Sequence, residues 1–172
     1  MRTSKNKNKE VPFRHITIIG VGLIGGSLGL AIKQRYPSIR ITGVDRKEIL
    51  KKALASGAID HSTNSITKGV NGSELVILAQ PIGVIQKSLP IMAQHISPTA
   101  IVTDVGSIKK SIVQEAEKYF PKGNLIGGHP MTGAETSGIQ SAQSLLFENA
   151  VYVLTPVSNT LSKNVLRLAH FL

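Results

Sequence analysis

The chain has 172 residues, of which 41% are hydrophobic and none is cysteine, and its formal net charge is +10. This length suits one well-packed domain or slightly more, and the lack of cysteine excludes a disulfide framework and a thiolate metal site. The histidines, at positions 15, 61, 95, 129 and 170, show no ligand-like spacing, so we expect no metal.

Part of the positive charge lies at the start of the chain. Residues 1–14 form a polar leader whose basic residues are Arg2, Lys5, Lys7, Lys9 and Arg14, opposed only by Glu10. Such a segment is typical of a disordered, solvated tail. Aromatic residues make up only 4% of the chain and do not alternate with basic ones, so we expect no nucleic-acid partner. The remaining charge suits small anionic ligands.

The segment from Ile16 to Gly29 predicts a strand, a glycine turn and the start of a helix. Ile16 to Ile19 are apolar or β-branched, as in a strand buried on both faces. The residues that follow match G-x-G-x-x-G, a dinucleotide-binding pattern in which the glycines permit a tight turn, a bare backbone beside the pyrophosphate and close helix packing. We therefore predict a cofactor-binding turn that includes Gly20, Gly22, Leu23, Ile24 and Gly25, with free helix N–H groups facing the phosphates.

An acidic residue about twenty positions later strengthens this interpretation, because it can bind the adenosine ribose. Asp45 closes the apolar run of residues 39–44 and meets this requirement. Its charge would repel a 2′-phosphate and favours NAD over NADP. Arg46 keeps NADP open, since an arginine at this place can accommodate the extra phosphate.

The same glycine-rich segment also resembles a membrane span or a signal peptide, because residues 16–32 carry no charge and follow basic residues. Its glycines dilute the apolar character, no small-residue cleavage site follows, and Asp45 lies where a nucleotide site needs it. We therefore expect no membrane segment, and a cytoplasmic location.

The rest of the chain alternates predicted strands and helices. We expect helices over residues 23–35, 47–56, 81–94 and 107–119 and from about residue 158. We expect strands over residues 39–44, 74–79, 100–103, 125–127 and 150–155. Between these we expect a short strand near residue 59, a short helix near residue 66, and a loop or broken helix over residues 133–143. This alternation predicts an α/β fold, a doubly wound, mostly parallel sheet of the Rossmann type with right-handed crossovers.

Ligands of such sheets bind beyond the carboxyl ends of the strands. Besides the glycine turn and Asp45, we expect these ends to present Gln80, Pro81 and Asp104 to the cofactor, with Lys109 and His129 nearby. The segment Asp104-Val105-Gly106-Ser107-Ile108-Lys109 also has a plain interpretation, in which Asp104 or Ser107 caps a helix. His129 lies between glycines and a proline, so we expect it in irregular backbone at the end of a short strand, where it can accept a proton near neutral pH.

Three segments together carry a family resemblance. GVGLIGGSLGLA, DVGSIK and GGHPMTGAETSG, in this order and spacing, resemble the dinucleotide-binding half of prephenate dehydrogenase over residues 15–172. The resemblance implies NAD-dependent oxidative decarboxylation of prephenate to 4-hydroxyphenylpyruvate, a step of tyrosine biosynthesis. Arogenate dehydrogenases share these motifs, so the form of the substrate stays open.

The resemblance also implies roles for single residues. It places the catalytic histidine at His129, which would accept the proton of the ring hydroxyl, and the hydroxyl-binding serine at Ser107. Lys109 belongs to the same motif as Ser107 and would act as a substrate-binding or gate residue. Glu135 matches an acidic residue near the active-site entrance, where it would act as a gate or an orienting group.

The resemblance finally implies a division of the chain and a missing half. We expect residues 1–14 as the leader, 15–157 as the dinucleotide-binding domain, and 158–172 as the start of a helix that leads to an absent helical domain. That domain would form a homodimer and bind the substrate carboxylates, so a chain ending at Leu172 would bind NAD with little turnover. Two alternatives remain, a β-hydroxyacid dehydrogenase with a catalytic lysine and a non-catalytic NAD-binding module.

Overall fold

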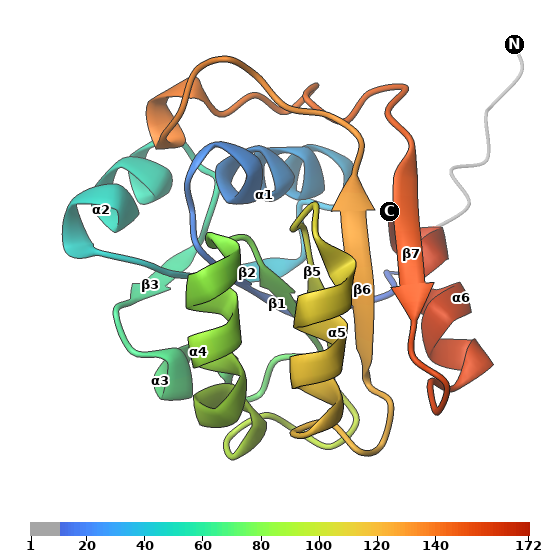
Figure 1. Cartoon of the computed structure of the whole chain (residues 1–172). Coiled ribbons are helices and arrows are strands. Elements are labelled where there is room, and N and C mark those ends of the chain that lie inside the picture. The colour runs from blue at the N-terminus through green and yellow to red at the C-terminus, as the bar shows by residue number, and fades with distance from the viewer. Residues whose placement is uncertain (1–10) are drawn as a thin grey trace, which may run out of the picture.

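The computed structural model describes residues 11–172, so most of the predicted leader lies outside the described residues. One seven-stranded sheet has the order β3-β2-β1-β4-β5-β6-β7, with β7 antiparallel to β6 and the other neighbours parallel (Figure 1). The predicted doubly wound, mostly parallel α/β fold is confirmed. The strands are β1 (His15–Ile19), β2 (Arg40–Val44), β3 (His61–Thr63), β4 (Leu75–Leu78), β5 (Ile101–Asp104), β6 (Leu125–Pro130) and β7 (Tyr152–Pro156).

Helices cover both faces of the sheet and divide the core into two layers. One layer packs α1, α2 and α6 with the short η1, and the other packs α3, α4 and α5. The helices are α1 (Leu23–Arg35), α2 (Lys47–Ala55), α3 (Ile66–Val70), α4 (Ile82–Ala93), α5 (Lys109–Glu117), α6 (Ser162–Phe171) and the 3₁₀ turn η1 (Ile139–Ser141). Strands β1 and β4 are buried along their whole length, as expected for a parallel sheet covered on both faces.

Several boundaries differ from the predictions; among them, α5 begins at Lys109 rather than Ser107 and β7 begins at Tyr152 rather than Ala150. The short strand expected near Ile59 lies at β3, and the last helix begins at Ser162 rather than near residue 158. The prediction that β6 stops at Gly127 was wrong. The strand continues to Pro130 because β7 pairs with it from Ile126 to Pro130, and His129 therefore lies in regular strand opposite Val153.

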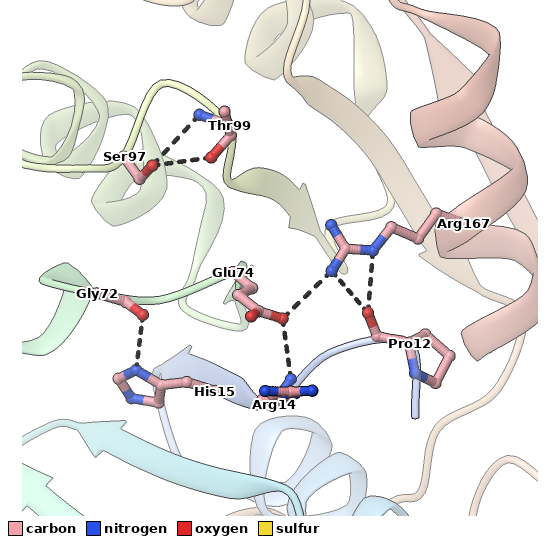
Figure 2. A network of polar contacts seen from close by, with 8 residues as sticks. All are labelled: Pro12, Arg14, His15, Gly72, Glu74, Ser97, Thr99 and Arg167. Carbon is pink, nitrogen blue, oxygen red and sulfur yellow. Dashed lines mark hydrogen bonds and ion pairs between the residues drawn. The ribbon is translucent and has the colours of Figure 1, made fainter. Parts of the chain in front are cut away.

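At the amino ends of the strands, a polar network joins α6 to β1 and β4 (Figure 2). Arg167 donates to the carbonyl oxygen of Pro12 at 2.6 Å and to Glu74 at 3.2 Å, and Glu74 also accepts from the backbone N–H of Arg14 at 2.9 Å. The Arg167 guanidinium lies 4.2 Å from the ring centre of Phe13, which packs edge-on against Phe171. None of the helices between residues 11 and 172 has the length and hydrophobicity that a bilayer span requires.

Candidate active site

The glycine turn connects β1 to α1 at the carboxyl edge of the sheet. Gly20 has a φ of +91°, and a Cβ there would lie 2.7 Å from the backbone of Ala79. A Cβ on Gly25 would run into the carbonyl oxygen of Gly20, whereas a Cβ on Gly22 would meet nothing within 4 Å. Gly20 and Gly25 are thus required by the protein's own packing. Gly22 instead leaves a bare surface on which a ligand can approach the backbone.

The start of α1 is a suitable site for an anion. Gly22 is its N-cap, no side chain within the described part of the protein caps it, and its first turn has no acidic residue. The first N–H groups of an α-helix have no partner inside the helix, and the helix dipole makes this end electropositive. The backbone of Leu23, Ile24 and Gly25 therefore offers donors to a phosphate group.

Asp45 follows β2 and holds the glycine turn in place. One of its carboxylate oxygens accepts the backbone N–H of Val21 at 2.8 Å, and the other accepts the N–H of Arg46 at 2.7 Å. Asp45 is half-buried and Arg46 is exposed beside it. A carboxylate oxygen accepts more than one hydrogen bond, so Asp45 retains acceptor capacity for ribose hydroxyls next to the turn.

Gln80 and Pro81 follow β4 on the other side of the turn. The Cγ atom of Gln80 lies 2.9 Å from where a Gly20 Cβ would be, so the structure brings Gln80 to the glycine turn. Its side-chain oxygen accepts a hydrogen bond from Ser88 at 3.1 Å, which sets the orientation of the amide. Pro81 is exposed and is the N-cap of α4.

Asp104 lies in the interior rather than on the surface lined by the glycine turn. Its side chain is fully buried. Its oxygens accept from the backbone N–H of Gly106 at 2.8 Å and of Gly128 at 3.2 Å, and it forms an ion pair with Lys109. The structure therefore does not bring the Asp104 carboxylate to the surface lined by the glycine turn. Asp104 also does not cap α5, whose N-cap is Ile108 without a side-chain hydrogen bond.

His129 and Ser107 reach the same edge from β6 and from the loop between β5 and α5. His129 is half-buried, and Ser107 is exposed. The loop contacts β6 one residue before His129, because Lys109 donates to the carbonyl oxygen of Gly128 at 2.6 Å. Within residues 11–172 neither the imidazole nor the Ser107 hydroxyl has a hydrogen-bond partner, so both can serve a ligand. Glu135 is exposed in the segment that follows β6.

Sequence reasoning missed the buried hydroxyls of Thr103 on β5 and Tyr152 on β7, whose side chains both lie next to Gly128 of β6. Within the described residues the two hydroxyls have no hydrogen-bond partner other than each other. Burial raises the pKa of the Tyr152 phenol, and the negative charge of Asp104 raises it further. Tyr152 comes next to Gly128 only because β7 folds back along β6, and no local pattern indicates that pairing.

Comparison with known proteins gives this arrangement a context. The family described as "Prephenate dehydrogenase, nucleotide-binding domain" matches residues 28–172. The chain is 40% identical over 160 residues to a prephenate dehydrogenase of Bacillus subtilis, covering 91% of this chain and 43% of that protein. It is 42% identical over 151 residues to one of Lactococcus lactis, covering 86% of this chain and 42% of that protein. The chain thus spans less than half the length of these relatives.

Solved structures agree with the sequence comparison. Arogenate dehydrogenase of Synechocystis has a TM-score of 0.86 and 34% identity, over 92% of this chain and 55% of that one. Prephenate dehydrogenase of Aquifex aeolicus, in complex with hydroxyphenyl propionate and NAD⁺, has a TM-score of 0.85 and 30% identity, over 92% of this chain and 56% of that one.

Proposed function

Because the chain belongs to the prephenate dehydrogenase family, as its nucleotide-binding domain, we propose that it serves the NAD-dependent oxidative decarboxylation of prephenate to 4-hydroxyphenylpyruvate in tyrosine biosynthesis. The observation that carries this proposal is the bare, uncapped turn at Gly22, beside a carboxylate at Asp45 and on the same sheet edge as His129. A dinucleotide and a proton acceptor both fit this edge.

The residues at this edge fit NAD. The pyrophosphate would lie against Gly22 and the first N–H groups of α1, and the adenosine ribose would hydrogen-bond to Asp45. A 2′-phosphate would be repelled by Asp45, which favours NAD over NADP, although Arg46 is exposed at the same place. Gln80 and Pro81 would contact the cofactor from the end of β4. When bound, NAD supplies the acceptor for the hydride that leaves the substrate.

The protein's own contribution to the reaction is the handling of a proton. His129 would accept the proton of the ring hydroxyl while the ring carbon bonded to this hydroxyl loses hydride. Ser107 would hydrogen-bond to the same hydroxyl. The ring carboxylate then leaves as carbon dioxide, and its bonding electrons make the ring aromatic. The imidazolium returns its proton to the phenolate oxygen, so protons balance and His129 is neutral again. Glu135 would act as a gate or an orienting group at the entrance.

The substrate and the assembly extend the proposal beyond the residues described. Prephenate is proposed first, with arogenate as the alternative, because a solved relative acts on each. The relatives' additional length would contain groups that bind the substrate carboxylates and that form a homodimer.

The test measures NAD binding and substrate oxidation separately. We expect titration calorimetry to show NAD binding to this chain, with NADP bound more weakly. We expect NADH absorbance to rise with prephenate when the chain is joined to the remaining half of a relative. Oxidation of arogenate but not prephenate would replace the proposed substrate, and NAD binding without oxidation of either would contradict the enzymatic function.

A further inference from the structure

The pairing of β6 changes along its length. Main-chain pairing with β5 stops at Thr103 and Ile126, while pairing with β7 continues to Pro130. In an antiparallel pair, alternate residues direct their backbone groups toward the partner strand and the others direct them away. Gly128 directs its backbone groups away from β7, toward a place where β5 has already ended. Buried backbone groups without a partner are costly, so something other than β5 must bind them.

Two side chains take the place of the missing strand. Asp104 accepts the N–H of Gly128 at 3.2 Å, and Lys109 donates to its carbonyl oxygen at 2.6 Å. The two side chains also form an ion pair with each other, with side-chain exposures of 0% and 16% respectively. Both backbone groups of Gly128 are therefore held from the side of β5. The carbonyl bound by Lys109 belongs to the peptide that joins Gly128 to His129.

The surroundings leave this peptide little freedom. A Cβ on Gly128 would run into the backbone oxygen of Asp104 and would lie 2.8 Å from the Thr103 hydroxyl and 3.0 Å from the Tyr152 ring. Only glycine fits there without a shift of the backbone. On the other edge of β6, Val153 of β7 is paired with His129 itself.

Stability alone is a poor reason for such an ion pair. Removing two charges from water costs several kcal/mol per ion, and apolar residues of similar size often serve a core equally well or better. Burial lowers the pKa of Lys109, and the hydrogen bond and charge of Asp104 oppose that shift. The Lys109 ammonium is already bound to Asp104 and Gly128, so it is not a free cation waiting for a substrate carboxylate.

We propose that Asp104 and Lys109 are positioning residues, which fix the peptide between Gly128 and His129 and thereby the direction of the His129 imidazole. This inference rests on the proposed role of His129 as the proton acceptor. It gives Lys109 a different role from a substrate-binding or gating group and Asp104 a different role from a cofactor ligand.

The test compares Lys109→Met and Lys109→Gln with the matched control Lys110→Met, whose lysine is exposed on the next position of the same helix. The first readout is the NMR signal of the His129 ring and of the Gly128 carbonyl carbon in the chain itself. In Lys109→Met we expect both to shift, and the ring signals to broaden or double. Glutamine keeps an N–H donor, so Lys109→Gln should restore part of the original spectrum. Lys110→Met should keep the original NMR spectrum. The NAD dissociation constants of all the variants should stay within about twofold of the original value.

The second readout is turnover in the chain joined to a relative's remaining half. Misplacement of the imidazole predicts a kcat about tenfold to a hundredfold lower in Lys109→Met at an unchanged KM for prephenate. A raised KM at an unchanged kcat would overturn the inference in favour of a substrate-binding lysine. Identical His129 signals in Lys109→Met and Lys110→Met would also overturn it. If Lys109→Met does not fold, unaltered His129 signals in a folded Asp104→Asn variant would overturn it, and shifted signals would support it.

These outcomes are distinguishable from a failure of the proposed function. If the chain with no substitution, joined to a relative's remaining half, oxidises neither substrate, the proposed function fails, while the NMR comparison still decides whether the ion pair orders His129.

Discussion

The two ends of the sheet use polar groups in opposite ways. At the amino end, Glu74, Arg167 and the backbone of Pro12 and Arg14 bind one another (Figure 2). At the carboxyl end, the first N–H groups of α1, the His129 imidazole and the Ser107 hydroxyl have no such partners within residues 11–172. Polar groups that bind each other stabilise the fold, whereas polar groups left without partners can bind a ligand.

The carboxyl end nevertheless also contains polar groups that bind each other and are buried. The Asp104 and Lys109 pair binds the backbone next to His129 from the side of β5. The carboxyl end therefore differs from the amino end in having both exposed groups without partners and a buried ion pair. Substitutions at the amino end should change stability and spare binding, and substitutions of the exposed groups at the carboxyl end should do the reverse.

The largest expected effect is at His129. In the chain joined to a relative's remaining half, His129→Asn should lower kcat about 10²- to 10⁴-fold, because a general base is lost. Steady-state kinetics with NAD and prephenate measures it. The melting temperature and the NAD dissociation constant should stay near their original values. The exposed His95 provides the matched control, and we expect His95→Asn to have the same kcat as the parent. Full turnover in His129→Asn would remove this imidazole from the mechanism.

The next test separates two glycines of one turn. Gly25→Ala should destabilise the fold by about 1–3 kcal/mol, because its Cβ would run into the carbonyl oxygen of Gly20. Gly22→Ala should cost less than about 1 kcal/mol of stability, the loss of a favourable N-cap residue, because nothing lies within 4 Å of its Cβ, yet bind NAD about tenfold more weakly. Urea unfolding and titration calorimetry measure the two effects. Undiminished NAD affinity in Gly22→Ala would place the pyrophosphate elsewhere.

A third test breaks the network at the amino end. Arg167→Met should lower the free energy of unfolding by about 1–2 kcal/mol, through lost hydrogen bonds to Pro12 and lost contact with the Phe13 ring. The half-exposed pair with Glu74 adds little to this value. NAD affinity should not change. Lys163→Met, on the same helix and exposed, is the control for which no loss of stability is expected. A weaker NAD affinity in Arg167→Met would contradict the separation of the two ends.

The smallest expected effect is a pH dependence at His15. This side chain hydrogen-bonds to the carbonyl oxygen of Gly72 and to the Thr42 hydroxyl, both at 3.0 Å. Burial lowers its pKa from the ordinary value of 6.5, so the unfolded chain binds a proton more readily than the folded one. Its contribution to stability is complete above about pH 6.5 and is lost as the pH falls below that. Melting temperatures from pH 7 to pH 5 should fall less in His15→Gln than in the parent.

Much of the fold and of the site could be predicted along the chain. The first strand, the turn and the acidic end of the second strand are predicted by the run Ile16 to Ile19, the glycines at 20, 22 and 25, and Asp45. Such features depend on neighbouring residues and on periodicity, so local sequence patterns are enough to predict them. The same holds for the alternation of strands and helices that predicts a parallel sheet.

What only the tertiary structure decided concerns contacts between distant segments. β7 extends β6 to Pro130 and turns the expected irregular backbone at His129 into regular strand. Asp104 is in the interior rather than at the surface lined by the glycine turn, because the Gly128 backbone and the Lys109 ammonium satisfy its oxygens. The sequence by itself supplied the candidates for binding a dinucleotide and for accepting a proton. Packing decided which of them face a ligand, because burial and pairing arise only when remote strands come together.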